Sequence, residues 1–589
     1  MLNTTGGTMK RTNCLAATLT LVLCISGCDN KSPQQTDPQF VEAHTASPVT
    51  FMANQIGFNS AQAKFVVLNN VMANSFTVTN LATNETILRG QLSEAKVWVP
   101  AGDELYRSAD LSSIRQQGRF KLNLEGEDTS FEFTIDNQAY RPLHDAALKA
   151  FYYNRSSTAI ESAYTDTYAR ASGHLDEEVK VHQSAATESR PAGSKVISAK
   201  GWYDAGDFGK YVVNSGISTY TLLLSYDQHR AFYQQHSAQI PESNNDLPDI
   251  LDEIKWNLAW LKTMQDEDGS VYHKLTTLEW PGIEMPEEDT RERYVIGKST
   301  SAALNFAAVM AYASRVYALE PELNGEYSTW LDAAKQAWLW AKKNPNLVYQ
   351  QPEDVKSGEY GDDNFSDEFL WAAVELYLAT LDIEYLVDFN IENVELVSPA
   401  WQHVSVLPLI SLLNYQGSGI DSTLVTKARD KLLELADEYV QQYRDSIFKV
   451  AMVTPDFVWG SNSVALNKAL VLAQAYKVSG KEEYKQAAEG GLDYILGQNP
   501  LAFSFVTGFG DNSVKFPHYR TSAADTIEAP IPGFVAGGPQ PGKQDKCDYQ
   551  FSSPAKTYVD DWCSYASNEV AINWNAPLVY MLAFKLNNE

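Results

Sequence analysis

The sequence predicts a small β-sandwich followed by a much larger, mainly α-helical domain. Between residues 49 and 138, apolar and polar residues alternate, as in "RFKLNLEG" and "SFEFTID". This alternation is typical of strands with one buried face. After residue 140 the apolar period lengthens to about 3.6 residues, the period of an amphipathic helix. The chain has 589 residues, 44% of them hydrophobic, so it is long enough to bury more than one core.

The first 28 residues read as an export signal. Lys10 and Arg11 precede the apolar run "CLAATLTLVLCISGC", which is shorter than a bilayer-spanning helix requires. The run resembles a bacterial lipoprotein signal, whose "ISGC" box implies that Cys28 is lipidated after cleavage. An ordinary secretory signal or a short anchor is the alternative. The lipoprotein interpretation implies a lipid-anchored protein of the bacterial cell envelope, facing the periplasm or in the outer membrane.

Residues 29–48 carry three prolines and lack apolar periodicity, so they are predicted to be a flexible linker. Of the five cysteines, two lie within the signal run and Cys28 would carry lipid, which leaves Cys547 and Cys563. An oxidising compartment allows these two to pair as a disulfide. Two free buried thiols are the alternative.

Residues 139–589 are predicted to form the helical domain. In residues 247–265 the apolar positions follow alternating spacings of four and three, which form one helical stripe. Similar stretches are residues 302–319, 328–343, 366–380, 423–440, 463–478 and 482–496. Such an array can fold as a toroid of helical hairpins, a solenoid or two bundles, and the lack of a fixed repeat disfavours the solenoid.

The charge balance excludes one class of partner. The chain has 46 Lys and Arg against 74 Asp and Glu, a net charge of -28. This charge repels nucleic acid phosphates and favours neutral or cationic ligands. We expect no nucleic acid partner, and the sequence implies no protein partner.

Two carboxylates stand three residues apart in "GWYDAGDFGKYV", residues 201–212. Hydrolysis of a bond between sugars needs one protonated carboxyl group and one ionised carboxylate, and Asp204 and Asp207 are candidates for the ionised site. The alternative is a turn in which Asp204 caps a helix that starts near Asp207.

Two further segments carry candidate site residues. Glu569 opens an apolar stretch in "YASNEVAINWNAPLVYMLAF", where an acid also commonly complements a helix dipole. His518 and Arg520 lie in the long loop "LGQNPLAFSFVTGFGDNSVKFPHYR". Taken alone, such His and Arg residues are usually structural or surface groups.

These three segments together resemble the family 9 glycoside hydrolases, the cellulase family with an (α/α)6 barrel. "GWYDAGDFGKYV" is similar to the family's base motif, "LGQNP" with "PHYR" to its histidine and arginine loop, and "YASNEVAINWNAPLV" to its acid motif. Residues 49–138, including "NQIGF", resemble the immunoglobulin-like domain that often precedes this barrel. The predicted fold is therefore a mainly α (α/α)6 barrel preceded by a small all-β immunoglobulin-like sandwich.

The resemblance implies a role for each matching residue. Asp207 would be the general base that holds the attacking water, Asp204 would orient that water, and Glu569 would be the general acid. His518 and Arg520 would bind the sugar on the non-reducing side of the cleaved bond. Tyr519 replaces the second histidine of the usual "PHHR" and is included as a candidate contact. The reaction would invert the anomeric carbon, with the two carboxyl groups about 6.5–9.5 Å apart, and needs no cofactor.

The remaining candidate residues concern the sugar and metals. Trp459 and Trp562 are candidate walls of sugar subsites, although tryptophans more often fill cores. "GDDNFSDEFLWAA" resembles a family calcium loop, with Asp363, Asp367 and Glu368 as candidate ligands of structural calcium, and a capped, solvated helix start is the alternative. Zinc, which some family members bind, is not expected, because Gly173 precedes His174 where a cysteine is needed.

For the substrate we favour glucosamine-containing oligomers of chitosan. The compact lipoprotein form resembles the exo-β-D-glucosaminidase branch of the family, and the inserts at 171–200 and 520–560 are expected to close the cleft. The acidic surface suits a cationic amino sugar. A cellodextrinase or β-1,4-glucanase acting on cello-oligosaccharides is the alternative. A catalytically silent sugar-binding lipoprotein and an all-α structural lipoprotein are alternatives of other classes.

Overall fold

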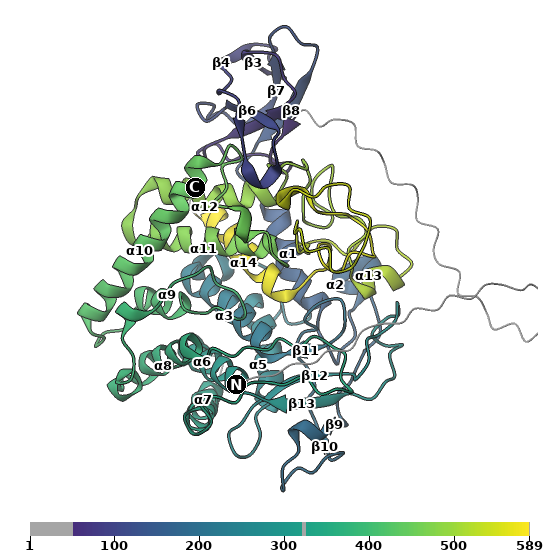
Figure 1. Ribbon diagram of the computed structural model, residues 1–589, viewed down its shortest axis with the longest axis vertical. Coiled ribbons are helices and arrows are strands. Elements are labelled where there is room, and N and C mark those ends of the chain that lie inside the picture. The colour runs from purple at the N-terminus through teal and green to yellow at the C-terminus, as the bar shows by residue number, and fades with distance from the viewer. Residues whose placement is uncertain (1–50, 321–324, 588–589) are drawn as a thin grey trace, which may run out of the picture. The chain divides into compact units, whose positions relative to one another are not determined.

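We describe the computed structural model of the chain over residues 51–320 and 325–587. The predicted signal segment 1–28, with Cys28, and the predicted linker 29–48 lie outside these residues. All of the described residues belong to one compact unit. Figure 1 shows the strands of its N-terminal part and the helices that follow.

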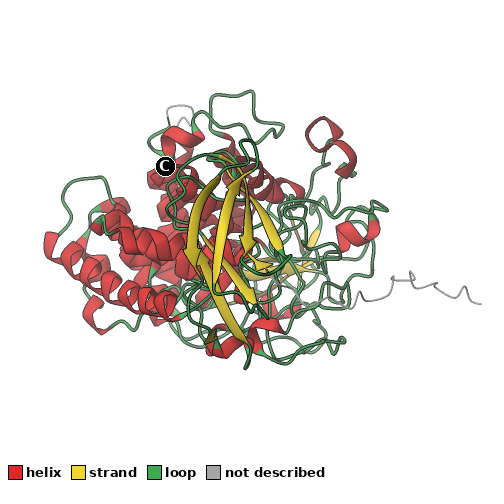
Figure 2. Ribbon diagram, turned by 90° about the horizontal axis from the view of Figure 1, so that it is seen from above, coloured by secondary structure: helices red, strands yellow, loops and turns green. Residues whose placement is uncertain are grey.

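The N-terminal part is a sandwich of two four-stranded antiparallel sheets, seen in yellow in Figure 2. One sheet has the order β1(Phe51–Met52), β2(Phe65–Asn69), β6(Leu105–Asp110), β5(Lys96–Val97). The other has the order β4(Thr86–Gln91), β3(Ser75–Asn80), β7(Gly118–Leu124), β8(Ser130–Ile135). Alternate residues of β3 and β7, such as Phe76, Val78, Phe120 and Leu122, point into a shared core.

The helical part follows from Arg141 onward. Its helices of eight or more residues are α1(Arg141–Tyr153), α3(Val212–Gln228), α5(Asp249–Thr263), α6(Thr300–Tyr317), α7(Glu326–Lys343), α8(Ser366–Thr380), α9(Leu407–Asn414), α10(Ser422–Asp445), α11(Ser461–Ser479), α12(Glu482–Ile495) and α14(Ile572–Asn587). Short helices are α2(Ser162–Thr165), α4(Arg230–Tyr233) and α13(Arg520–Ala524).

The helices form two rings. Helix α14 packs on α3, α3 on α6, α6 on α8, α8 on α9, and α11 on α14, and these helices are buried on nearly every side. Outside them, α1 packs on α14, α5 on α3, α7 on α6 and α12 on α11. Helices that are apolar all round belong inside and amphipathic ones outside. The prediction of an (α/α)6 barrel behind a β-sandwich is confirmed.

A five-stranded sheet within the helical part was not predicted. Its order is β10(Lys195–Val196), β9(Val179–Val181), β13(Tyr294–Lys298), β12(Tyr272–Thr276), β11(Lys210–Tyr211). Its strands have two to five residues, and every residue of β12 is buried, so no alternation marks it in the sequence. The sheet supports the turn that carries Asp207, which ends at β11.

The sandwich and the barrel share buried polar contacts. Asn54 Nδ2 donates to Asp493 Oδ1 on α12 at 2.6 Å, and the Gln55 amide donates to the Leu496 carbonyl at 2.9 Å. Lys585 of α14 donates to Gln62. No described helix has the length and apolar character needed to cross a membrane.

Candidate active site

Asp204 and Asp207 lie in an irregular turn that precedes β11. Helix α3 begins only at Val212, so Asp204 does not cap a helix that starts near Asp207. The amide of Gly209 donates to Asp207 Oδ1 at 3.2 Å, and Asp204 also closes the turn by a backbone hydrogen bond to Gly209. Phe208 has a left-handed backbone (φ +61°), and its carbonyl accepts from Arg293 Nη1 at 2.8 Å. Side-chain contacts thus fix a conformation that non-glycine residues rarely adopt.

Backbone contacts bring the other candidate segments to this turn. The Ile572 amide donates to the Asp204 carbonyl at 2.8 Å, and Glu569 lies in an extended segment that pairs with His518. Helix α14 begins three residues after Glu569, so Glu569 is not in the first helical turn. A Cβ on Gly206 would lie 2.6 Å from the His518 carbonyl oxygen, so only glycine allows this approach.

Asp207 and Glu569 line the same cavity, whose volume is about 910 Å³. The two residues are 362 positions apart in the chain (569 minus 207). The arrangement therefore has the feature that acid–base hydrolysis of a glycoside requires, which is two carboxyl groups that face one sugar-sized space.

The pKa values of Glu569 and Asp204 are raised by their surroundings. Burial, and then the charge of Asp207, raise the pKa of Glu569 well above its usual value. Burial and the Asp207 charge raise the pKa of Asp204 to about 7, while donors from Tyr360 and Asn214 oppose the rise. Glu569 is thereby suited to hold a proton that it can donate to a leaving group.

His518 and Arg520 sit beside the Asp207 turn. His518 Nδ1 donates to the Trp562 carbonyl at 2.6 Å, which leaves Nε2 as the acceptor, and burial lowers the pKa of this histidine to about 4. Arg520 Nη1 donates to the Gly206 carbonyl at 2.7 Å, and its Nε donates to the Pro281 carbonyl at 3.1 Å. Arg520 thus joins the turn to the loop between β12 and β13.

Of the five candidate sugar contacts, only Trp459 lines the cavity; His518, Tyr519, Arg520 and Trp562 do not. The Tyr519 ring is 1% exposed and packs on Phe534, and its hydroxyl donates to Asn154 at 2.7 Å, so Tyr519 is a core residue and not a sugar contact. Trp562 stacks on His518 with ring centroids 4.3 Å apart, so it supports the histidine and does not line the cavity. Trp459 does line it and is 41% exposed.

Several residues that line the cavity or hold the two aspartates were not proposed as site residues by sequence reasoning. The Tyr211 hydroxyl donates to Asp207 Oδ2 at 2.6 Å, and the Tyr360 hydroxyl donates to Asp204 Oδ2 at 2.8 Å. Asn214 Nδ2 lies 3.0 and 2.9 Å from the two Asp204 oxygens. The cavity is also lined by Trp280, Trp401 and Trp574. The signals available were Tyr211, next to last in the base motif, and the loop tryptophans, but a single sequence does not show which of these converge.

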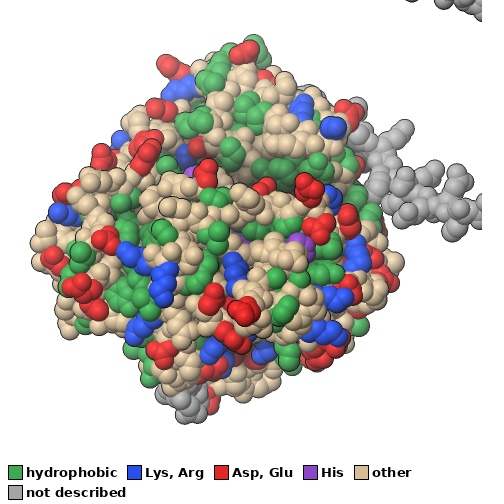
Figure 3. Space-filling view, turned by 60° about the horizontal axis from the view of Figure 1, so that its bottom comes forward, with side chains coloured by type: hydrophobic (Ala, Val, Ile, Leu, Met, Phe, Trp, Pro, Cys, Tyr) green, Lys and Arg blue, Asp and Glu red, His purple; other side chains and the backbone are tan. Residues whose placement is uncertain are grey.

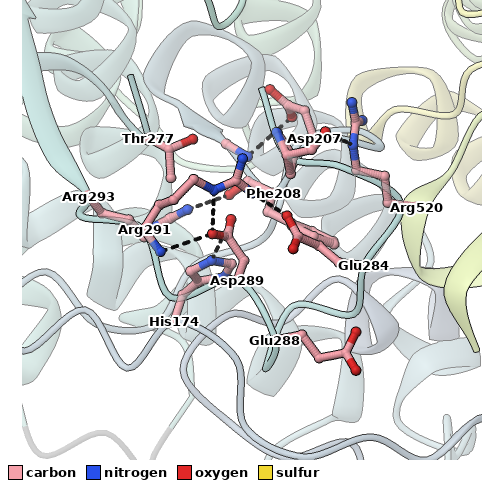
Figure 4. Close-up of polar contacts among 12 residues, drawn as sticks. His174, Asp207, Phe208, Thr277, Glu284, Glu288, Asp289, Arg291, Arg293 and Arg520 are labelled. Atoms are coloured by element: carbon pink, nitrogen blue, oxygen red, sulfur yellow. Dashed lines mark hydrogen bonds and ion pairs between the residues drawn. The ribbon is translucent and has the colours of Figure 1, made fainter. Parts of the chain in front are cut away.

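The loop between β12 and β13 forms one wall of the cavity through Trp280. Figure 4 shows how this loop is fixed: Asp289 lies between Arg291 and His174. Arg291 Nε donates to Asp289 at 2.7 Å and its Nη1 to the Trp280 carbonyl at 2.6 Å. His174 Nε2 lies 3.2 Å from Asp289. The inserts 171–200 and 520–560, which were expected to close the cleft, contribute none of the cavity's lining residues.

Gly173 and His174, where a family zinc site was not expected, contact other protein groups. His174 Nδ1 lies 2.8 Å from the Tyr203 hydroxyl, and its other ring nitrogen faces Asp289. A Cβ at Gly173 would lie 2.5 Å from the Pro286 Cβ, so a cysteine there would displace the neighbouring loop. The residues at this position do not fit a zinc site that uses a cysteine before His174.

The acids of the predicted calcium loop do not all lie together. Asp363 is exposed, whereas Asp362 and Asp367 lie against Glu368. The Glu368 carboxylate is fully buried and neither of its oxygens has a hydrogen-bond donor. Asp367 Oδ2 accepts from the Val404 amide at 2.8 Å. The two Glu368 oxygens, which are hard donors without other partners, fit Ca²⁺.

Cys547 and Cys563 form a disulfide, with their Cα atoms 6.0 Å apart. It closes a loop that carries Tyr549 and the Asp560–Asp561 turn. The bridge stabilises the chain by about 3 kcal/mol in the loop-entropy model. Asp560 accepts from the amides of Lys515 and Phe516, which start the segment that leads to His518.

The fold and this pair of facing carboxyl groups define a glycoside hydrolase. Residues 140–582 match the description "Glycosyl hydrolase family 9" and residues 47–129 match the "Cellulase N-terminal ig-like domain". The chain belongs to glycosyl hydrolase family 9.

Relatives of known name agree with this assignment. The chain is 40% identical over 543 residues to a xyloglucan-specific endo-β-1,4-glucanase of Bacteroides ovatus (89% of this chain, 92% of the relative). It is 33% identical to a cellodextrinase of Butyrivibrio fibrisolvens (90% and 98%). Among solved structures, a family 9 protein of Bacteroides ovatus has a TM-score of 0.85 at 38% identity (91% and 98%), and a metagenome-derived family 9 endoglucanase has 0.84 at 31% (91% and 99%).

The prediction of an exo-glucosaminidase was wrong. The relatives are named as glucanases and a cellodextrinase, which supports the alternative that was set beside it. The argument from charge was weak for a physical reason: net charge does not describe a surface. The face in Figure 3 carries Lys and Arg among its Asp and Glu side chains, so it does not present a single sign to a cationic sugar.

Proposed function

We propose that the protein hydrolyses β-1,4-linked glucans, with cello-oligosaccharides as substrates, and inverts the anomeric carbon. The observation that carries this proposal is the convergence of Asp207 and Glu569 on one cavity. Asp207 deprotonates a water molecule that attacks the anomeric carbon, and Glu569 protonates the departing sugar oxygen. Asp204, held by Asn214 and Tyr360, orients the water.

The lining of the cavity supports a sugar chain as substrate. Trp280, Trp401 and Trp459 present indole surfaces along it, and such rings stack on the apolar faces of sugars. His518 and Arg520 are polar residues beside the Asp207 turn but are not among the lining residues of this cavity. The names of the relatives support glucose as the repeating unit.

The test is analysis of the products from three β-1,4-linked substrates: cellotetraose, xyloglucan and chitosan oligomers. We expect glucose or cello-oligosaccharides from cellotetraose, with the α-anomer appearing first by NMR. Xyloglucan, incubated in parallel, reports whether branched chains are accepted. Release of glucosamine from chitosan oligomers, with cellotetraose untouched, would overturn the glucan proposal. A protein that binds cellotetraose without cleaving it would instead be a silent sugar-binding protein.

We also propose that Asp362, Asp367 and Glu368 bind structural Ca²⁺. The two unpartnered oxygens of the buried Glu368 support this assignment. The ion would offset the repulsion among three carboxyl groups and fix the start of α8, and it takes no part in the chemistry. Asp363, which is exposed, is not among the proposed ligands.

For the location, we propose export and anchoring through a lipid on Cys28. The "ISGC" box supports this proposal, and the Cys547–Cys563 disulfide is of the kind found in oxidising compartments. Fractionation of a bacterial expression host tests it. The wild-type chain should enter the membrane fraction, and Cys28→Ser should not; equal partition of both would exclude the anchor.

A further inference from the structure

A second group of chemically active side chains lies outside the active-site cavity. His144 and Asp145 are neighbours on α1, and His236 belongs to the irregular segment between α4 and α5. Their ligand atoms all lie within 4.8 Å of one another, and no other group of three or more His, Cys, Asp or Glu meets this criterion among residues 51–320 and 325–587; the acidic group around Glu368 is more widely spaced. None of the three residues lines the active-site cavity.

The three side chains converge on one carboxylate oxygen. His236 Nε2 lies 2.7 Å and His144 Nδ1 lies 3.3 Å from Asp145 Oδ1. The two imidazole rings are nearly perpendicular, at 88°, with centroids 5.0 Å apart. Two imidazoles and a carboxylate approach from different directions, and an ion between them would replace these hydrogen bonds; this donor set suits divalent transition metals.

The surroundings orient the ligands as a metal site requires. His144 Nε2 lies 3.2 Å from the Tyr233 hydroxyl, which in turn lies 2.8 Å from Ser225 Oγ. If His144 donates its Nε2–H to this hydroxyl, its Nδ1 lone pair faces Asp145 and His236. Such an outer partner on the second ring nitrogen is the usual companion of a metal-bound histidine.

The two histidines are buried, whereas the aspartate is reached by solvent. The side chains of His144 and His236 are 0% and 2% exposed, while that of Asp145 is 42% exposed. Water can therefore complete the coordination on the Asp145 side, as in zinc sites with three protein ligands. Asp145 makes its ion pairs with these two histidines.

We propose that His144, Asp145 and His236 bind a divalent transition-metal ion, with Zn²⁺ the best match to two imidazoles and one carboxylate. The ion would join α1 to the segment that leads into α5. Because it lies outside the cavity, its effect would be on stability and not on turnover. The site is separate from His174, where zinc is not expected.

The test measures zinc binding by the chelator-treated full chain. The buffer contains excess Ca²⁺, so that Zn²⁺ does not report on the acidic group around Glu368. We expect one Zn²⁺ per chain by calorimetry and by elemental analysis after gel filtration, together with a higher melting temperature. Asp145→Asn and His236→Gln should weaken binding at least about tenfold.

His182→Gln is the matched control. His182 is also a largely buried histidine that faces one carboxylate, Asp354 at 3.1 Å, but it has no third ligand. The His182→Gln variant should bind Zn²⁺ like the wild type. If His236→Gln fails to fold, Asp145→Asn decides the outcome, because its position is half-exposed. The cellotetraose turnover of Asp145→Asn should equal that of the wild type. A wild-type chain that takes up no Zn²⁺, or Asp145→Asn that binds it equally, would show a hydrogen-bonded trio and overturn the proposal.

Discussion

The hydroxyl of Tyr211 donates a hydrogen bond of 2.6 Å to Oδ2 of Asp207. The same hydroxyl accepts from the Gly358 amide at 3.2 Å, and the Gly358 carbonyl accepts from Lys274 Nζ at 2.7 Å. Tyr211 thus connects the proposed base to a loop held by a buried lysine. The phenol holds one oxygen of Asp207 and the Gly209 amide holds the other, so the orientation of the carboxylate is fixed.

Tyr211→Phe tests this connection. A hydrogen bond to a charged group contributes about 1.5–3 kcal/mol, so kcat on cellotetraose should fall roughly ten- to hundredfold. The fold should be retained, because the ring still packs on Tyr360. Tyr220→Phe is the control, since it removes a buried hydroxyl group that donates to the Leu407 carbonyl outside the cavity. Equal rates for Tyr211→Phe and Tyr220→Phe would show that the hydroxyl does not position the base.

The contacts of these tyrosines show where sequence reasoning reaches its limit. The 366–380 helix was predicted with its observed bounds, because its apolar pattern is set by local periodicity. The Tyr360–Asp204 hydrogen bond joins residues 156 positions apart, and no local pattern encodes such a pairing. Tyr519 was misassigned because it stands between His518 and Arg520. Its backbone is extended (φ -140°, ψ 109°), and neighbours in an extended segment point to opposite sides.

Glu569→Gln separates the acid from the rest of the machinery. Without a proton donor, cleavage of cellotetraose should fall by about 10²- to 10⁴-fold, because its leaving group needs protonation. An aryl cellobioside with an acidic phenol as leaving group needs no such help and should lose far less activity. Glu320→Gln, which removes a partly buried acid outside the cavity, is the control. A similar loss on both substrates would contradict the acid role of Glu569.

The pH dependence of activity should report on Asp204. Its pKa of about 7 means that it gains a proton as the pH falls through neutrality, and kcat/KM should fall with it if the ionised form orients the water. Asn214 donates to both oxygens and so favours the charged form. Removing it in Asn214→Ala should raise the pKa of Asp204 further. The acidic limb of the kcat/KM profile should then move about one pH unit upward.

Asn305→Ala is the control for that shift. Asn305 is equally buried, but its Nδ2 donates to the Ser301 carbonyl and not to a carboxylate. Its acidic limb should stay at the wild-type position even if the protein becomes less stable. A limb that is unmoved in Asn214→Ala, or that moves to lower pH, would show that Asp204 does not control this part of the profile.

Calcium should stabilise the chain through Glu368 and not through Asp363. In the absence of an ion, the buried Glu368 carboxylate has no donor and lies against two other acids, so a bound Ca²⁺ removes both penalties. Millimolar Ca²⁺ should therefore raise the melting temperature of the chelator-treated wild type, by an amount that grows with ion concentration as mass action requires.

Glu368→Gln should lose this increment in melting temperature. In chelator it should melt higher than the wild type, because the substitution removes the buried charge. Asp363→Asn is the control. Asp363 is exposed, so this variant should respond to Ca²⁺ as the wild type does. If Glu368→Gln kept the full increment, Glu368 would not be a ligand of the ion. If Asp363→Asn abolished the increment, Asp363 would be a ligand, as the sequence pattern suggested.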